Sequence, residues 1–440
     1  ASRRTVAVSS VLALGLLLVS FASCATNVVA SVEEDAASAV PEASTPPGQV
    51  DADAVADGGP CDASDPECTG AIAACETVAW CLVDTPASGA RTLTAVWGAS
   101  KDDVWAVGSA GTILHYDGTS WGATPSGVPN TFFGVWGSGP KDVWVVSTQA
   151  VVLHTTGSQD GGAVWDNLAP ATYGSVPLDA TAIYAVWGSS VSNVRLGGRG
   201  FEVRLNDGAF RYSGKGSQVV SSRTADGGLL WRALPAREDA VRSIWGSSAT
   251  DVWITVDNSW SAPHEVGLTL HGTPYRGERP NPNVVNERAH CTGCVPGCTA
   301  CAVLGDQLEW TAVDGQSNVV LESLWGSGPG DVWAVGALGT IRRIRAGDER
   351  WQKVDSPTQQ DLHAVWGSGP DDVWFAGDKG TILHFDGTKI EPSSVQLPLG
   401  PRPDLRGIWG SGPDDVWIVG DGVTLHYTGP KAGVHRGEGE

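Results

Sequence analysis

A tryptophan pair separated by eight residues recurs along this chain and restricts what the chain can fold into. The first member lies in phrases such as Ala-Val-Trp-Gly-Ser and occurs seven times, at Trp97, Trp136, Trp187, Trp245, Trp325, Trp366 and Trp409. The second member is a Trp in six copies, and Arg195 replaces it in the third copy. Seven copies of a short β-rich unit predict a ring of blades rather than an enzyme fold with a single core.

The sixth copy shows how one repeat forms one blade. Residues 362–366 and 373–376 read as its first two strands, and the Gly-Pro-Asp-Asp turn between them suits a tight reversal. Residues 381–385 read as the third strand, and a Trp-containing segment supplies a fourth strand in most copies. Four short antiparallel strands per repeat are typical of a propeller blade.

The two ends of the repeat region complement each other. The seventh copy has no fourth strand, whereas the sequence around Trp80 matches the fourth-strand sequence around Trp351. We therefore predict an all-β fold, a seven-bladed β-propeller over residues 77–428, closed by the N-terminal strand so that no sheet edge stays exposed. On this reading the repeated Trp residues are mostly core.

The repeat unit reads A-V-W-G-S-G-P-D-D-V-W-A-V-G-x-x-G-T-I-L-H-Y-D-G-T-S-W. It resembles the Trp-rich repeats of secreted bacterial β-propeller proteins, which are distant relatives of the Asp-box and kelch propellers. The resemblance covers about residues 77–428 and implies the fold. It does not imply one function, because such propellers include lectins, adhesins, assembly factors and some glycan-active enzymes.

The N-terminal sequence is typical of an exported protein. Residues 1–24 have the layout of a signal peptide, and its end, Phe-Ala-Ser-Cys, resembles a lipobox in which Cys24 would be lipidated. Ordinary cleavage after Ala25 is the alternative. Residues 25–60 are acidic and lack a hydrophobic period, which predicts a disordered tether. We expect a cell-envelope lipoprotein in the outer membrane or at the cell surface, or otherwise a secreted protein.

The other eight Cys residues form two groups of four. Disulfides are the expected chemistry in an exported chain, and zinc in the second group is the alternative. The first group begins a lead-in over residues 61–76, and the second lies in a Cys-rich insertion in blade four, at about residues 273–307. No metal or other cofactor is expected. The predicted half-cystines are Cys61, Cys68, Cys75, Cys81, Cys291, Cys294, Cys298 and Cys301.

One position differs among the repeats while its neighbours stay constant. Four residues before the first Trp the side chain is always apolar, and two residues before it the side chain is always small. The position between them, which we call the variable ring, holds Thr94, Phe133, Tyr184, Arg242, Glu322, His363 and Arg406. Inner strands begin at the mouth of the central channel in this architecture, so these residues are candidate ligand-binding groups, with simple solvent exposure as the alternative.

Loops that follow the second strands open on the same side and add Arg199, Asp257, Trp260 and Lys379 to the candidate binding residues. Arg242 and Arg406 would bind an acidic sugar or another carboxylate, and Phe133, Tyr184 and Trp260 would provide stacking surface. Insertions at about residues 209–228 and 273–307 are expected on the opposite face, and residues 429–440 form a flexible tail.

These features favour a non-catalytic, monomeric binding module whose ligand is a glycan or a protein. A formal net charge of −21 argues against nucleic acid as a partner and leaves the lipid anchor as the expected membrane contact. The alternatives are a scaffold or adhesin that acts through its insertions and a polysaccharide-active enzyme. The enzyme reading needs paired carboxylates, and Glu322 is the lone carboxylate of the variable ring.

Overall fold

The computed structural model describes residues 78–89, 91–149, 151–159, 162–168, 182–206, 209–223, 229–233, 240–257, 267–274, 308–397 and 400–430. All of them belong to one compact unit, Cys61–Glu440. These residues form β-strands joined by turns, with two short 3-10 helices, η1 (Ser109–Gly111) and η4 (Asp378–Gly380). The predicted all-β class is confirmed.

Within the described residues, the strands form seven four-stranded antiparallel sheets and one two-stranded sheet. The first three large sheets are β2 (Leu93–Ser100), β3 (Asp103–Gly108), β4 (Ile113–Tyr116) and β5 (Trp121–Ala123); β6 (Phe132–Gly139), β7 (Asp142–Ser147), β8 (Val152–Thr155) and β11 (Asp166–Asn167); and β12 (Ala182–Ser190), β13 (Asn193–Asn206), β14 (Ala209–Arg223) and β15 (Leu229–Ala233). The two-stranded sheet pairs β9 (Ser158–Gln159) with β10 (Gly162–Ala163).

The later sheets repeat the same order from the inside outward. They are β16 (Ala240–Ser248), β17 (Asp251–Asp257), β18 (Thr269–Pro274) and β19 (Leu308–Val313); β20 (Leu321–Gly328), β21 (Asp331–Gly336), β22 (Thr340–Arg345) and β23 (Gln352–Val354); β24 (Leu362–Gly369), β25 (Asp372–Gly377), β26 (Ile382–Phe385) and β27 (Ile390–Pro392); and β28 (Leu405–Gly412), β29 (Asp415–Gly420), β30 (Thr424–Tyr427) and β1 (Trp80–Leu82).

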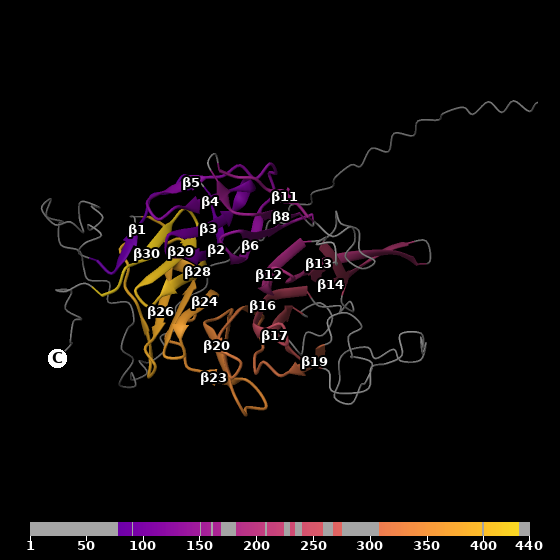
Figure 1. The fold of residues 1–440 in the computed structure, drawn as a ribbon. Helices are drawn as coiled ribbons and strands as arrows, with labels where there is room; N and C mark the ends of the chain where they lie inside the picture. Colours follow the sequence, from indigo (N-terminus) through magenta and orange to yellow (C-terminus); the bar gives the residue numbers. More distant parts are fainter. Residues whose placement is uncertain are drawn as a thin grey trace, which may run out of the picture. The chain divides into compact units, whose positions relative to one another are not determined.

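The large sheets, numbered here as blades one to seven in the order given, stand around a central axis (Figure 1). The first strand of each blade packs against the first strand of the next, in the order β2, β6, β12, β16, β20, β24 and β28, and β28 packs against β2 in turn. The β-propeller class is therefore confirmed.

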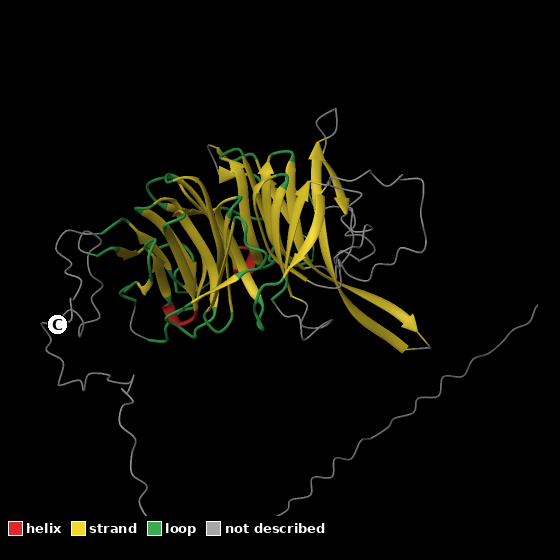
Figure 2. Cartoon of the chain, turned by 90° about the horizontal axis from the view of Figure 1, so that it is seen from below, coloured by secondary structure: helices red, strands yellow, loops and turns green. Residues whose placement is uncertain are grey.

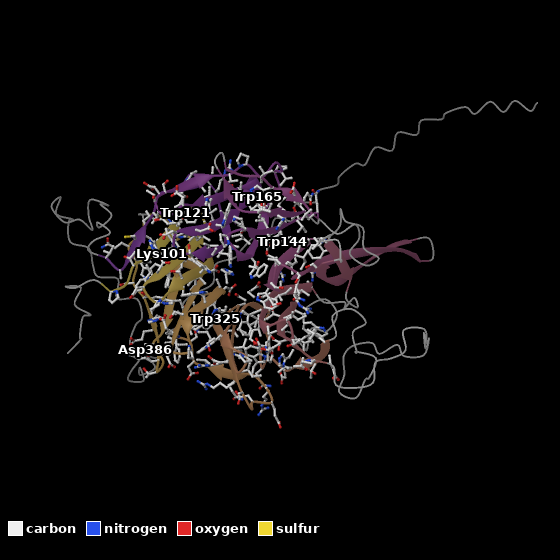
Figure 3. All side chains as sticks on the ribbon, in the orientation of Figure 1. Lys101, Trp121, Trp144, Trp165, Trp325 and Asp386 are labelled. Carbon is white, nitrogen blue, oxygen red and sulfur yellow. The ribbon has the colours of Figure 1, made fainter. Side chains whose placement is uncertain are left out.

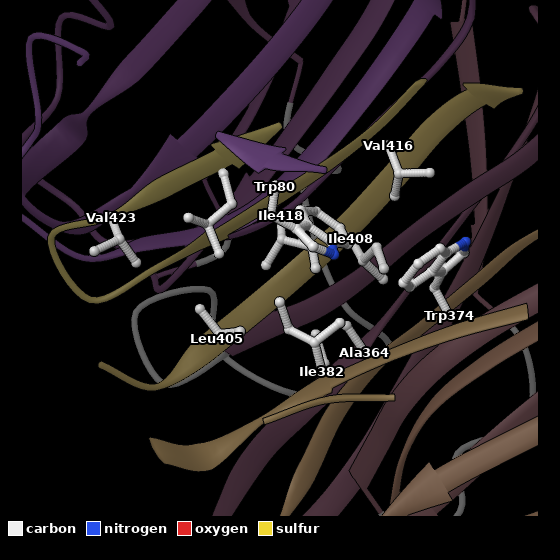
Figure 4. Close-up of a cluster of buried hydrophobic side chains, with 11 residues drawn as sticks. Trp80, Ala364, Trp374, Ile382, Leu405, Ile408, Val416, Ile418 and Val423 are labelled. Atoms are coloured by element: carbon white, nitrogen blue, oxygen red, sulfur yellow. The ribbon is translucent and has the colours of Figure 1, made fainter. Parts of the chain in front are cut away.

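Strand β1 comes from the N-terminal end of the repeat region but lies in blade seven. It pairs antiparallel with β30, with Trp80 opposite Tyr427 and Leu82 opposite Leu425. The Trp80 indole is 2% exposed and meets Trp374 of blade six edge-on, at a ring-centroid distance of 5.3 Å. Figure 4 shows this apolar cluster between blades six and seven. Residue 80 thus joins segments that lie far apart in the sequence.

The first Trp of each pair, which we call the inner Trp, packs against a glycine of the following blade. A Cβ built on Gly188 would lie 2.5 Å from Cη2 of Trp136, and one on Gly367 would lie 2.6 Å from Cη2 of Trp325. The same relation joins Trp409 of blade seven to Gly98 of blade one. The glycine in the Trp-Gly phrase is needed because any side chain there would overlap the neighbouring indole.

In five of the seven blades the second Trp of the pair lies beside a histidine and an aspartate of its own blade. In blade seven the Trp417 and His426 rings stack at 3.8 Å and 6°, and His426 Nε2 lies 2.6 Å from Asp415 Oδ1. Burial alone would raise the pKa of Asp415, but hydrogen bonds from His426 and Ser411 outweigh it and hold the pKa below its usual value. His426 thus forms a structural hydrogen bond within its own blade.

The arrangement recurs around the ring. Related Asp–His pairs are Asp103–His115, Asp142–His154, Asp251–His271 and Asp372–His384. In blade five, Arg343 replaces His and pairs with Asp331 at 2.5 Å. The aspartates begin the second strands, and each accepts a hydrogen bond from the third strand of the same blade.

One insertion lies at the opposite end from the one expected. Strand β12 stops pairing with β13 at Arg199, whereas β13 and β14 stay paired as far as Asn206 and Ala209. Second strands run toward the end of the ring where inner strands begin, so this hairpin extends beyond the channel mouth and not on the far side. Figure 2 shows the two long strands projecting past the other blades.

The remaining predicted segments are described only in part. Strand β18 ends at Pro274, at the end of blade four opposite the mouth. Residues 275–307 lie outside the described residues, as do Cys24, Trp260 and residues 431–440 of the predicted tail. Cys81 is disulfide-bonded, and the other predicted half-cystines also lie outside the described residues. Among the described residues there is no helix with the length and apolar character needed to cross a membrane.

Candidate functional site

A cavity of about 240 Å³ opens where the inner strands begin, and the whole variable ring lines it. The structure thus brings together seven side chains that are spread over more than three hundred residues of sequence. Small residues two positions before each inner Trp, such as Ala95 and Ser323, form the wall between them. Figure 3 shows the side chains on the ribbon and labels Trp325, whose blade contributes Glu322 to the cavity. The seven ring residues are Thr94, Phe133, Tyr184, Arg242, Glu322, His363 and Arg406.

A β-bulge at each ring position explains this convergence. In blade one, Leu93 pairs with Gly108 and Ala95 pairs with Val107, so Thr94 is an extra residue without an opposite partner. The same register shift occurs at the corresponding point of the other six blades. A bulge bends the strand and redirects the extra side chain. The side chain that varies most among the repeats is therefore the one directed at the mouth.

Three basic ring residues are paired with aspartates that lie fifteen residues later, at the end of the second strand or just after it. The distances are 2.7 Å from Arg242 to Asp257, 2.6 Å from His363 to Asp378 and 2.9 Å from Arg406 to Asp421. Arg406 also contacts Asp404 at 3.2 Å. Sequence reasoning included Asp257 but missed Asp378, Asp404 and Asp421, although the constant fifteen-residue offset could have revealed two of them.

These pairs shift the pKa of the groups involved. The hydrogen bond from Arg406 lowers the pKa of Asp421, and the same bond raises the pKa of Arg406. Burial acts to lower the pKa of Arg242, but its bond to Asp257 and the nearby charge of Glu322 outweigh burial and raise it. Both arginines therefore stay charged, with much of that charge balanced inside the protein.

Two aromatic residues occupy the adjacent part of the ring. Phe133 meets Tyr184 edge-on, with a centroid distance of 5.4 Å. The Arg242 guanidinium lies 5.0 Å from the centre of the Tyr184 ring, which places a cation over that ring. Part of the stacking surface expected for a sugar is thus already used by a side chain of the protein.

Blade five departs from the pattern of charge pairs. Glu322 is its ring residue, and the position fifteen residues later is Ala337 instead of a charged group. Within the described part of the chain, no hydrogen bond or ion pair joins Glu322 to another residue. The next residue, Leu338, is 66% exposed and has a left-handed backbone with φ 54°. Its N–H donates to Asp361 Oδ1 at 2.8 Å, which holds the turn in place.

The other predicted site residues lie at the rim. An Arg199 terminal nitrogen is 3.7 Å from Asp257, so two arginines of adjacent blades approach one carboxylate. Lys379 is exposed on a left-handed turn, and its N–H donates to Asp404 at 3.1 Å. Trp260 lies outside the described residues. Leu338 was not predicted as a site residue. It lies in the turn after the second strand of blade five, and that position in the repeat could have indicated that it lies at the rim.

Known proteins share the fold at low sequence identity. No protein-family model matches the chain, and no curated sequence is significantly similar to it. A solved structure of YCF48 bound to D1 peptide has a TM-score of 0.54 and 18% identity, covering 83% of this chain and all of the other. YCF48 from Cyanidioschyzon merolae gives 0.53 and 18%, covering 80% and 99%. Virginiamycin B lyase from Staphylococcus aureus gives 0.52 and 15%, covering 77% and 95%. At these identities the likeness establishes the propeller fold alone.

Proposed function

We propose that this protein is a non-catalytic binding module of the cell envelope, a seven-bladed propeller closed by its N-terminal strand that takes a glycan or polypeptide ligand at the channel mouth. One observation carries the proposal. The position at which the repeats differ most is the bulged position that lines the cavity, whereas its neighbours repeat the same residue types. The uniform neighbours pack within the fold, and the varied side chains between them give the cavity a lining that suits one ligand.

The size of the cavity restricts what enters it. A volume of about 240 Å³ falls below the ~300–1,000 Å³ of typical drug-sized ligand sites. One side chain or one sugar unit fits, and a folded domain would rest on the rim. The ligand therefore inserts one group and makes its other contacts with rim residues such as Lys379 and Leu338.

The path of the chain suits a tethered protein. Trp80 pairs with Tyr427, at the end of blade seven opposite the mouth, so the segment before residue 78 starts from that end. An anchor at Cys24, followed by an acidic tether, would leave the mouth directed away from the membrane. The proposed location is the outer membrane or the cell surface.

A matched pair of variants tests the proposal on the full-length chain. Glycan arrays and peptide arrays are probed with the wild type, with Tyr184→Ala, and with Lys389→Ala as a surface control away from the cavity. Binding that Tyr184→Ala weakens and Lys389→Ala retains supports a ligand at the mouth. Binding that both variants retain, or no binding on either array, rejects it and favours a scaffold that acts through its insertions.

The His363–Asp378 pair favours enzymatic activity as the second candidate function. A histidine oriented by a carboxylate can act as a general base, and this one lines the cavity. One of the similar solved structures is a lyase, which is an enzyme. If an arrayed ligand is chemically changed by the wild type and bound but unchanged by His363→Gln, the protein is an enzyme and the non-catalytic proposal is wrong.

A further inference from the structure

The basic residues of the variable ring each have an aspartate partner, whereas the acidic one has no hydrogen-bonding partner among the described residues. Arg242, His363 and Arg406 each have an aspartate within hydrogen-bonding distance. An incoming carboxylate would have to compete with those aspartates for the same donors. The arginines are therefore poor anchors for an acidic ligand, contrary to the expectation from sequence.

Glu322 is in the opposite situation. It lines the same cavity, is partly exposed, and has no direct partner among the described residues. Its charge acts on Arg242, but no hydrogen bond joins the two. A carboxylate with free acceptor oxygens at the edge of a partly enclosed cavity favours a ligand group that carries N–H donors and a positive charge.

Leu338 adds an apolar contact in the same blade. A leucine with φ of 54° is conformationally unfavourable. Its side chain is 66% exposed, so little burial within the described structure compensates for that cost. The Asp361 carboxylate fixes the turn by accepting the N–H of Leu338. An exposed apolar side chain on a fixed turn, in the same blade as the Glu322 carboxylate, is suited to a ligand that carries a cation next to an apolar group.

The hairpin of blade three indicates the chemical class of that ligand. Among the described residues, strand β13 pairs only with β14 beyond Arg199, and β14 pairs with β15 only between Val219 and Arg223. Residues 200–206 and 209–218 therefore form a two-stranded ribbon on the mouth side, and within the described part of the chain no third strand pairs with either of its outer edges. Such edges offer main-chain hydrogen bonds to an extended polypeptide, and a two-stranded ribbon is only marginally stable without further support.

We propose that the ligand of the mouth is a basic polypeptide segment. Its Lys or Arg side chain enters the cavity and donates to Glu322, a neighbouring apolar residue packs on Leu338, and its main chain is recognised by the edge of the β13–β14 hairpin. The formal net charge of −21 attracts such a segment over longer distances. This inference rests on the proposed binding function and specifies the ligand of the same site.

An array of acetylated, amidated nonapeptides tests it on the full-length protein. The central residue is Arg, Lys, citrulline, Gln or Glu, and the flanking positions are randomised with and without Leu. Citrulline keeps the shape of Arg and removes its charge. We expect the wild type to prefer Arg over citrulline about ten-fold, because a charge-assisted hydrogen bond is lost. Glu322→Gln should remove that preference, and Leu338→Asn should remove the preference for flanking Leu.

Other outcomes separate the two levels of the proposal. Equal binding of Arg and citrulline peptides by the wild type, or an Arg preference that survives in Glu322→Gln, overturns the basic-ligand inference. Binding to a glycan array that Tyr184→Ala abolishes also overturns this inference, but it preserves the function proposed for the mouth. A variant in which a two-residue turn replaces residues 201–214 should bind the peptides more weakly, and unchanged peptide binding contradicts the part assigned to the hairpin.

Discussion

The indole of Trp409, in blade seven, lies so close to Gly98, in blade one, that a Cβ on the glycine would be 2.5 Å from Cη2 of the indole. The two residues come from opposite ends of the repeat region and belong to a ring of seven similar Trp–Gly contacts. A contact of this kind leaves no room for a side chain. It therefore makes the fit between the first and last blades sensitive to a single methyl group.

Gly98→Ala should destabilise the protein, because the added methyl group would overlap the Trp409 ring. Overpacking of this kind costs about 1–3 kcal/mol. Thermal and urea unfolding would measure the change in the free energy of unfolding. Gly139→Ala is the matched control, since a Cβ there has no atom within 4 Å. Equal stability of the two variants would show that the first and last blades do not depend on this contact.

Trp80→Ala should destabilise the protein more strongly. The Trp80 indole is 2% exposed, packs against Trp374 and donates from Nε1 to Ser393 Oγ at 3.1 Å. Replacing a buried Trp by Ala costs about 3–5 kcal/mol. Ser393→Ala removes the hydrogen bond alone and should cost about 1 kcal/mol. Urea unfolding of both variants separates packing from hydrogen bonding, and a mild effect of Trp80→Ala would mean that β1 contributes little.

Arg242→Ala and Arg406→Ala should both lower the free energy of unfolding, by different amounts. Arg242→Ala removes the partner that lies 2.7 Å from Asp257, whose side chain is 5% exposed, so a loss of about 1–3 kcal/mol is expected. Arg406→Ala breaks a pair in which both side chains are about one-third exposed, and about 0.2–1 kcal/mol is expected. Calorimetry of the single variants measures both losses of stability. A greater loss for Arg406→Ala than for Arg242→Ala would contradict the expected order.

Stability should fall in acid because of the Asp–His pairs. Hydrogen bonds from His hold the pKa of Asp142, Asp251, Asp372 and Asp415 below the usual 3.8 despite burial. A depressed carboxylate pKa contributes stability above about pH 3.8, and that contribution is lost as the pH falls toward the folded-state values. The melting temperature measured from pH 6 to pH 2 should drop in this range. His426→Phe keeps a ring on Trp417 but removes the donor, so its drop should be shallower than that of the wild type.

Leu338→Gly should leave stability unchanged or raise it by up to about 1 kcal/mol, because glycine adopts the left-handed conformation freely. The exposed leucine makes little contact that could be lost. The melting temperature checks this expectation. A clear decrease would show that Leu338 packs within the fold, and it would remove the reason for assigning this side chain to a ligand.

The sequence was sufficient to predict the four-stranded blade and the position of the candidate site. Trp pairs, turn residues and alternating apolar residues are local signals, and the structure places them in four-stranded sheets as expected. Position-by-position comparison of the repeats identified the seven residues that line the cavity. Such comparison works because equivalent positions of a propeller lie at the same height along one axis.

The partners of those residues were decided by the tertiary structure. Each ring residue occupies a bulge, and pairing across the first two strands brings Asp257, Asp378 and Asp421 back to the mouth. That contact depends on strand register, which the alternation of side chains does not specify at a bulge. Register also decided that the blade-three hairpin extends on the mouth side. The sequence by itself determined which residues face the channel. Folding determined that its arginines are already paired, whereas Glu322 has no hydrogen-bonding partner among the described residues.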